Sequence, residues 1–217
     1  MLPAFRLRHK GYTMIRPLLC ISLGAVLLAA PPVFAKETKL ERDAKALHAL
    51  AGGSTFCQPL EEAYDPEDAY KSWTFSFPAS WLGDGEEEEV TLIRIWCMSG
   101  AYNVVHLYYT YTEYDGLAPL SFAVPSYKAE YENDDALDGA LTDLNVVGFE
   151  SALRMINSEF DPETHAITAR GLWRGIGDAS DMGTWSFKNG AWALTHYEID
   201  ASYDGEINPK VVVDYPE

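Results

Sequence analysis

The chain has 217 residues, of which 47% are apolar and 13% aromatic, too much apolar material for an intrinsically disordered protein. It carries 16 basic and 33 acidic residues, a net charge of -17, whereas a nucleic-acid-binding protein needs a clustered basic surface. Length and composition therefore predict a globular protein with a packed core, and they exclude nucleic acid as the expected partner.

Residues 1–35 have the pattern of a secretory signal peptide. They contain four basic residues and no acid, and an apolar run spans residues 18–30. This run is shorter than the ~20 apolar residues that cross a bilayer as a helix, so a transmembrane anchor is the weaker interpretation. Small residues at Val33 and Ala35 predict cleavage before Lys36. We expect a soluble, periplasmic product without membrane insertion.

Cleavage at this point changes the charge of the protein. Residues 36–217, expected to form a single β-rich domain, keep 12 basic and 33 acidic residues, a net charge of -21. Such a surface repels anionic membranes and attracts cationic partners, although solubility alone is the simpler explanation. Met14 could be the true start of the chain, and the cleavage site would then be the same.

The cysteines are simple to assign once the leader is removed. Cys20 leaves with the signal peptide, so Cys57 and Cys97 are the two thiols of the exported chain. An oxidising compartment favours one intramolecular disulfide between them. Two free thiols or an intermolecular bridge are the alternatives.

Near the new N-terminus, residues 40–51 have the pattern of one short amphipathic helix. Thr38 and Glu41 have the spacing of a capping box, and apolar residues recur every three or four positions. Gly52 and Gly53 are expected to end the helix.

The rest of the chain alternates with the period of β-strands. Strands are expected around residues 73–77 and 103–111 and at 90–98, 120–124, 145–149, 153–157, 165–169, 184–187, 191–199 and 210–215. Asn189-Gly190 predicts a tight hairpin, and the acidic stretches 85–89 and 131–138 are expected to be exposed loops. Because no long helices separate the strands, we predict an all-β fold, an antiparallel sandwich or open barrel with one short N-terminal helix.

Signatures of catalysis are mostly absent, including the nucleophile elbow, the zinc-protease helix and the phosphate-binding loop. His196 and Glu198 have same-face spacing on a strand, but two ligands do not make a zinc site. The acidic turn with Asp200, Asp204 and Glu206 is interpreted as solvated rather than calcium-binding. No metal and no cofactor are expected.

The most unusual segment is RGLWRGIGD, residues 170–178, where three glycines flank Arg170, Trp173 and Arg174. The structural interpretation is that Arg174 anchors the turn that carries Asp178. The functional interpretation is that Arg174 binds a carboxylate or phosphate.

Two separated motifs resemble a known family. CMSGAYN at residues 97–103, with Tyr102 and Asn103, and RGIGD at 174–178 are similar to segments of a bacterial exported family known only as domain of unknown function 1176. The resemblance implies an envelope location and no known reaction. Relatives tend to have two further cysteines, and here Ala179-Ser180 and residues 202–205 stand in their places, so a second disulfide is not expected.

Together these features favour a non-enzymatic periplasmic protein that acts in binding or envelope maintenance. Its most concrete form is an inhibitor or sequestering partner of a cationic exported protein. One alternative is an envelope hydrolase that uses an acid pair with Arg174 or His196. The other is a purely structural envelope component.

Overall fold

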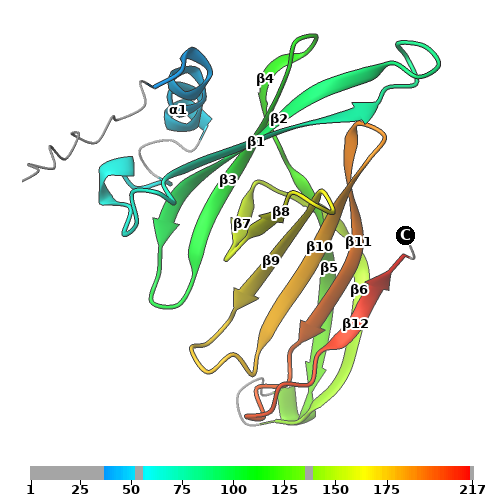
Figure 1. Cartoon of the computed structure of the whole chain (residues 1–217). Helices are drawn as coiled ribbons and strands as arrows, with labels where there is room; N and C mark the ends of the chain where they lie inside the picture. The colour runs from blue at the N-terminus through cyan, green and yellow to red at the C-terminus, as the bar shows by residue number, and fades with distance from the viewer. Residues whose placement is uncertain (1–36, 52–55, 135–138, 216–217) are drawn as a thin grey trace, which may run out of the picture. The chain divides into compact units, whose positions relative to one another are not determined.

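The computed structural model describes residues 37–51, 56–134 and 139–215, which form one α-helix, two short 3-10 helices and twelve strands (Figure 1). In chain order these are α1 (Lys39–Ala51), η1 (Leu60–Glu62), β1 (Tyr70–Pro78), β2 (Glu87–Ser99), β3 (Val104–Thr112), β4 (Gly116–Pro119), β5 (Phe122–Tyr131), η2 (Glu132–Asp134), β6 (Leu141–Ala152), β7 (Arg154–Ile156), β8 (Glu159–Asp161), β9 (Ala166–Leu172), β10 (Ser180–Lys188), β11 (Ala191–Asp200) and β12 (Lys210–Asp214). The expected signal peptide, the glycines at 52–53 and residues 135–138 of the second acidic stretch lie outside the described residues.

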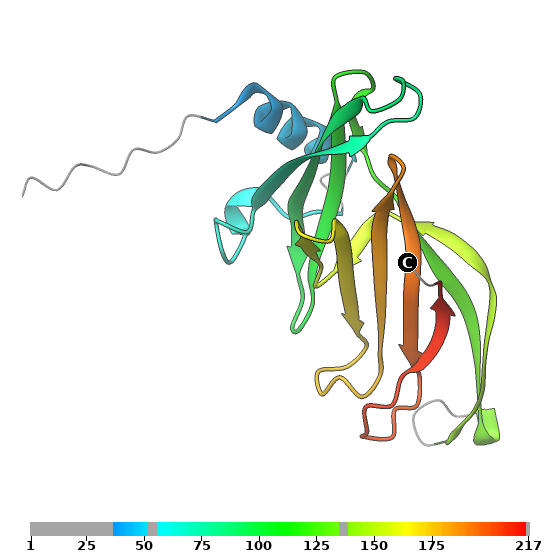
Figure 2. The same ribbon diagram turned by 45° about the vertical axis from the view of Figure 1, so that its right-hand side comes forward.

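The strands form three antiparallel sheets, so the all-β prediction is confirmed. Sheet A has the order β1-β2-β3-β4, and β7 also pairs with β3. Sheet C has the order β12-β11-β10-β9-β8, and β5 and β6 form a separate two-stranded ribbon, sheet B. Figure 2 shows this ribbon beside sheet C. All of these elements belong to one compact unit, Glu37–Glu217.

The predicted helix is confirmed as α1. It begins where the Thr38 hydroxyl accepts a hydrogen bond from the main-chain N–H of Glu41 at 3.1 Å, which satisfies one unpaired donor of the first turn. Ala44 and His48 are buried on one face, and Ala44 packs on apolar side chains of β2 and β3. The other face carries charged residues, as expected for a helix that covers one side of a sheet.

One core lies among the three sheets. Its buried members include Leu92 and Tyr108 of sheet A, Phe122 of sheet B, and Ile167 and Trp185 of sheet C. β2 is buried from Val90 to Cys97 because this core covers one of its faces while α1 covers part of the other. A strand buried on both faces has a continuous apolar run, which explains why VTLIRIWC does not alternate.

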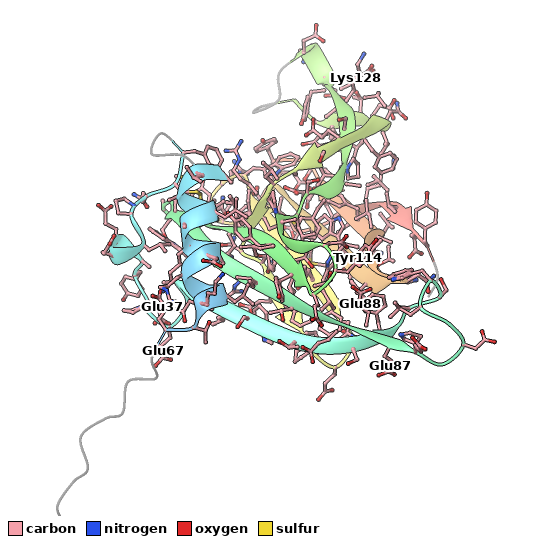
Figure 3. The ribbon with its side chains drawn as sticks, turned by 90° about the horizontal axis from the view of Figure 1, so that it is seen from above. Glu37, Glu67, Glu87, Glu88, Tyr114 and Lys128 are labelled. Atoms are coloured by element: carbon pink, nitrogen blue, oxygen red, sulfur yellow. A yellow bond between two sulfur atoms is a disulfide. The ribbon has the colours of Figure 1, made fainter. Side chains whose placement is uncertain are left out.

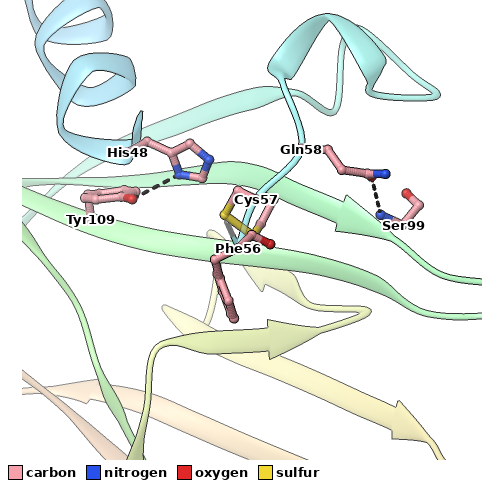
Figure 4. Close-up of a disulfide and its surroundings, with 7 residues drawn as sticks. His48, Phe56, Cys57, Gln58, Ser99 and Tyr109 are labelled. Carbon is pink, nitrogen blue, oxygen red and sulfur yellow. Dashed lines mark hydrogen bonds between the residues drawn. A yellow bond between two sulfur atoms is a disulfide. The ribbon is translucent and has the colours of Figure 1, made fainter. Parts of the chain in front are cut away.

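The disulfide pair joins the segment after α1 to β2 (Figure 4). The Sγ atoms of Cys57 and Cys97 lie 2.07 Å apart and their Cα atoms 4.5 Å apart, which is disulfide geometry. The main-chain N–H of Gln58 also donates to the carbonyl of Cys97 at 2.7 Å. The pairing expected from the sequence is therefore present in the structure.

Several local expectations need correction. Residues 87–89 are not a loop but the first residues of β2, because they continue its pairing with β1 from Ser76 to Pro78. The short strands β4 and β8 were not expected, since neither has an alternating run long enough to predict. The Asn189-Gly190 hairpin is confirmed, with φ values of 50° and 82° that suit its tight turn. Over the described ranges, no helix is both long and apolar enough to cross a bilayer.

Candidate functional site

The two motifs that carry the family resemblance meet in space. Tyr102 and Asn103 lie between β2 and β3, and residues 173–178 follow β9. The Asn103 side chain donates to the carbonyl of Leu172 at 2.8 Å and accepts from its N–H at 3.1 Å. The Tyr102 hydroxyl donates to the carbonyl of Trp173 at 3.1 Å. These side chains therefore fix the end of β9 to sheet A.

A third residue, Asn157, completes this junction and was missed by the sequence reasoning. It lies between β7 and β8, where the chain passes from sheet A to sheet C, and has a φ of 45°. Its side-chain oxygen accepts from the N–H of Val104 at 2.8 Å. Its side-chain nitrogen donates to Asn103 at 2.9 Å and to the carbonyl of Arg170 at 3.0 Å. Asparagine tolerates the left-handed conformation, but that tolerance alone does not identify the position in a sequence.

Arg174 and Asp178 form an ion pair within their own turn. Arg174 Nε donates to Asp178 Oδ1 at 2.6 Å, and Nη2 donates to the second carboxylate oxygen. The same Nη2 donates to the carbonyl of Tyr203 at 2.6 Å, and the N–H of Gly205 donates to Asp178 at 2.9 Å. The pair thereby connects the loop after β9 to the loop after β11.

Electrostatics agree with this geometry. The Arg174 guanidinium, helped by the N–H of Gly205, lowers the pKa of Asp178 to about 2. Asp178 is 1% exposed, so its carboxylate contacts other groups of the protein and not solvent. Because the guanidinium is already bonded to this carboxylate and to a carbonyl, the geometry favours an anchoring role over anion binding.

Trp173 and Arg170 also contact the protein itself. The indole of Trp173 stacks on Tyr127 with an interplanar angle of 2° and donates to Asp181 at 2.7 Å. Arg170 donates to the carbonyl of Gly177 at 3.4 Å. All six residues singled out from the sequence therefore have protein partners, and they line neither the depression around Trp81 and Tyr114 nor the one around Leu141 and Tyr203.

Another polar cluster lies beneath sheet A. His106 Nδ1 lies 3.0 Å from the Ser158 hydroxyl, and His106 Nε2 lies 3.1 Å from the carboxylate of Asp68. Arg94, 1% exposed, bonds to Asp68 and donates to the carbonyl of Ser158 at 2.5 Å. Burial, and then the positive charge of Arg94, lower the pKa of His106 to about 4, so the imidazole is neutral at physiological pH.

This cluster has the residue types of a Ser-His-Asp triad, but its geometry is that of a structural network. Ser158 is 1% exposed, and the hydroxyl of Tyr108 donates to its Oγ at 3.1 Å. A catalytic serine must face a substrate, whereas this hydroxyl is enclosed by protein. Through these hydrogen bonds, the segment between β7 and β8 is held against β2 and β3.

His196 lies on β11 with two acidic neighbours, 3.4 Å from Asp214 and 3.8 Å from Glu198. Within the part of the chain that the structure describes, no group of three or more His, Cys, Asp and Glu is placed to hold a metal ion. In the acidic turn, Asp200 accepts hydrogen bonds from the N–H groups of Ser202 and Asn208. These bonds close the turn and bury Asp200, which is 2% exposed, so the expectation that this acid is solvated is wrong.

An open depression lies on sheet A, away from α1. The 13 residues of β2 extend about 43 Å, whereas the 13-residue helix is about 20 Å long and leaves part of the sheet uncovered. There the surface forms a depression of 1220 Å³. Figure 3 shows Glu87, Glu88 and Tyr114 at this end of the molecule, with α1 at the other.

The lining of this depression combines carboxylates with aromatic rings. Its five acidic residues are Glu87, Glu88, Glu89, Glu113 and Asp115, and its three aromatic residues are Trp81, Tyr111 and Tyr114. None of its lining residues is basic. We call this surface the acidic depression. Tyr114 is 90% exposed and Trp81 is 57% exposed, so both rings are available to a partner.

Local structure explains how the acidic depression forms. Thr91 pairs with Tyr111 across β2 and β3, so the acidic residues before Thr91 in β2 lie beside those after Tyr111. The tight turn between β3 and β4 is held by Asp115, whose N–H donates to the hydroxyl of Thr112 at 2.9 Å. Two acidic segments that are distant in sequence are thereby brought together.

The chain matches no protein-family model, no curated protein and no solved structure. The resemblance to domain of unknown function 1176 therefore stays a prediction.

The acidic depression was only partly foreseen from the sequence. The sequence predicts the run GEEEE to be an exposed acidic stretch, but no local pattern connects it with TEYD at residues 112–115. Trp81 and Leu82, which precede the run, are adjacent and both exposed, and contiguous exposed apolar side chains mark interaction sites.

Proposed function

We propose that this protein is exported and acts without catalysis, by binding a cationic partner protein in the acidic depression. The observation that carries this proposal is the lining, which has five carboxylates and three aromatic residues and no basic side chain. Sequestration or inhibition of a basic exported protein is the function that such a surface supports best.

Both parts of the lining suit a cationic ligand. Carboxylates attract Lys and Arg over a distance and accept their hydrogen bonds on contact. Aromatic faces bind the same cations and also cover the apolar stems of these side chains. The net charge of -21 on residues 36–217 increases the attraction and makes the rate of association depend on salt.

Export is supported by two observations. Residues 1–35 combine a basic start, an apolar run and small residues before the expected cleavage site. Cys57 and Cys97 lie at disulfide distance, and disulfides persist mainly in oxidising compartments. The two motifs that carry the resemblance do not point to another ligand, since Arg174 hydrogen-bonds to Asp178 and Asn103 to the carbonyl of Leu172.

Binding of a fluorescent decalysine peptide, measured by anisotropy at low and high salt, tests the proposal. The variant Glu87→Gln/Glu89→Gln/Glu113→Gln should weaken binding about tenfold or more. The control Glu61→Gln/Glu62→Gln/Glu67→Gln removes the same charge from exposed positions near η1 and should have a much smaller effect. Equal weakening by both variants, or no binding to the unmodified protein, would contradict the proposal.

A further inference from the structure

We propose that the partner binds as an added strand: an extended segment, with basic and apolar residues in alternation, pairs with the free edge of β1. This inference rests on the proposed function and specifies how the partner is held. It concerns the main chain of β1 and the side chains on both of its faces.

β1 is the border strand of sheet A. Among the described strands, β2 alone hydrogen-bonds to it, and Figure 3 shows it at the outer side of the sheet. The β1-β2 ladder runs from Tyr70 opposite Ile95 to Pro78 opposite Glu87 without a register shift, whereas the β2-β3 ladder has one near Trp96. A regular edge presents an even row of N–H and C=O groups, which is a template for another strand.

The middle of this edge lacks the features that normally block pairing. Proteins protect edges with charges, prolines and bulges, and in β1 the only such residues are Lys71 and Pro78, near its two ends. Ser72, Thr74 and Ser76 lie between them, are exposed, and have small side chains that leave room for a neighbour. An added strand therefore has about five residues of unobstructed main chain to pair with.

The two faces of β1 differ in chemistry. On one face, Trp73 and Phe75 are half-buried. The ring centroid of Trp73 lies 5.1 Å from that of Phe160, and the ring centroid of Phe75 lies 4.0 Å from that of His165. Apolar side chains of an added strand would continue this layer of rings. The other face has the three hydroxyl residues named above, and it needs polar side chains in the added strand.

Register connects that polar face to the acidic depression. Ser76 lies opposite Glu89 and Pro78 lies opposite Glu87, so these carboxylates are one strand inside the edge. An added strand would lie about 10 Å from β2, a gap that Lys or Arg and Glu side chains span together. The carboxylates thus favour basic residues in the added strand beside Ser76 and Pro78, and the rings on the opposite face favour apolar residues between them.

Two peptides of the same charge test the inference. One alternates Lys and Val over eight residues, and the other is identical except for N-methyl groups on alternate main-chain nitrogens, which prevent pairing along one edge. Strand addition predicts that N-methylation weakens binding about tenfold or more, since several main-chain hydrogen bonds are lost. It also predicts that the unmodified peptide slows hydrogen exchange of the β1 amides but not of β12, another border strand.

The possible outcomes distinguish a failure of strand addition from a failure of the proposed function. If both peptides bind equally and exchange in β1 is unchanged, strand addition is wrong, while binding that depends on Glu87 and Glu89 keeps the proposed function. If neither peptide binds, strand addition is wrong, and the decalysine measurement decides separately whether the proposed function is also wrong. Slowed exchange of β12 instead of β1 would also overturn the assignment of the edge.

Discussion

At the scale of single residues, asparagine side chains form the hydrogen bonds to main-chain groups where sheets A and C meet. Asn103 gives and accepts one hydrogen bond at Leu172, and Asn157 connects Val104 to Arg170. An amide can replace a missing strand because it has both a donor and an acceptor. Each substitution that leaves a buried main-chain group unpaired costs about 1–3 kcal/mol.

Asn103→Ala should therefore lower the free energy of unfolding by about 1–3 kcal/mol, because both polar groups of Leu172 lose their partner. Urea denaturation measures the difference in unfolding free energy, provided that the dependence of this free energy on urea concentration is the same for both proteins. Tyr102→Phe is the matched control. It removes one hydroxyl from a residue that is 43% exposed, so it should lower the free energy of unfolding by less. A loss for Tyr102→Phe equal to that for Asn103→Ala would contradict the ranking.

Asp178 should make stability depend on pH. Its pKa is lowered to about 2 in the folded protein, so its contribution is present above the ordinary carboxyl pKa near 4 and is lost as the pH falls towards 2. Asp178→Asn should be less stable than the unmodified protein at pH 7, and the difference should shrink between pH 4 and pH 2. Denaturant titrations across this range measure it.

Arg174→Ala is the companion test of the same ion pair. If Arg174 is an anchor, this variant loses stability at pH 7 as Asp178→Asn does, and the double variant loses little more than either single one. A variant as stable as the unmodified protein would make Arg174 available for an anionic ligand and would refute the anchoring interpretation.

At the scale of elements, the disulfide connects the segment after α1 to β2, where Gln58 also forms hydrogen bonds with Cys97 and Ser99. Replacing Cys57 and Cys97 together by Ala should lower stability by up to about 4 kcal/mol, because the bond closes a long loop in the unfolded chain. Thermal unfolding of the exported protein, with and without reductant, gives the comparison. Mass spectrometry without reductant should find no free thiol, and two alkylatable cysteines in natively purified protein would contradict the bond.

The elements themselves were largely readable from local pattern. The helix, the β10-β11 hairpin and most strands follow from apolar periodicity and turn residues, which act within a few positions of the chain. β4 and β8 were missed because each is held in place by a longer neighbour, β3 or β9, rather than by its own residues. Strand β2 extends into an acidic run because β1 supplies partners for it.

At the scale of the whole molecule, the proposed export can be tested from the N-terminus of the purified protein and from the cell fraction that contains it. If the proposed signal peptide is cleaved, the apolar run at residues 18–30 leaves with it, so the mature N-terminus should be Lys36 and the protein should fractionate with soluble envelope contents. Peptide mapping of the purified protein identifies the first residue. Retention of residues 18–30 in the mature protein, or recovery with the membranes, would contradict the prediction.

By itself, the sequence determined the fold class, the helix, the candidate disulfide and the acidic charge, since each depends on composition or on short-range spacing. Tertiary structure alone decided which strands share a sheet, because pairing partners such as Thr91 and Tyr111 are chosen by long-range packing. It also decided that the Arg174 motif is bonded internally and that two acidic segments form one depression. Those outcomes depend on distances between residues far apart in the chain, which no local pattern contains.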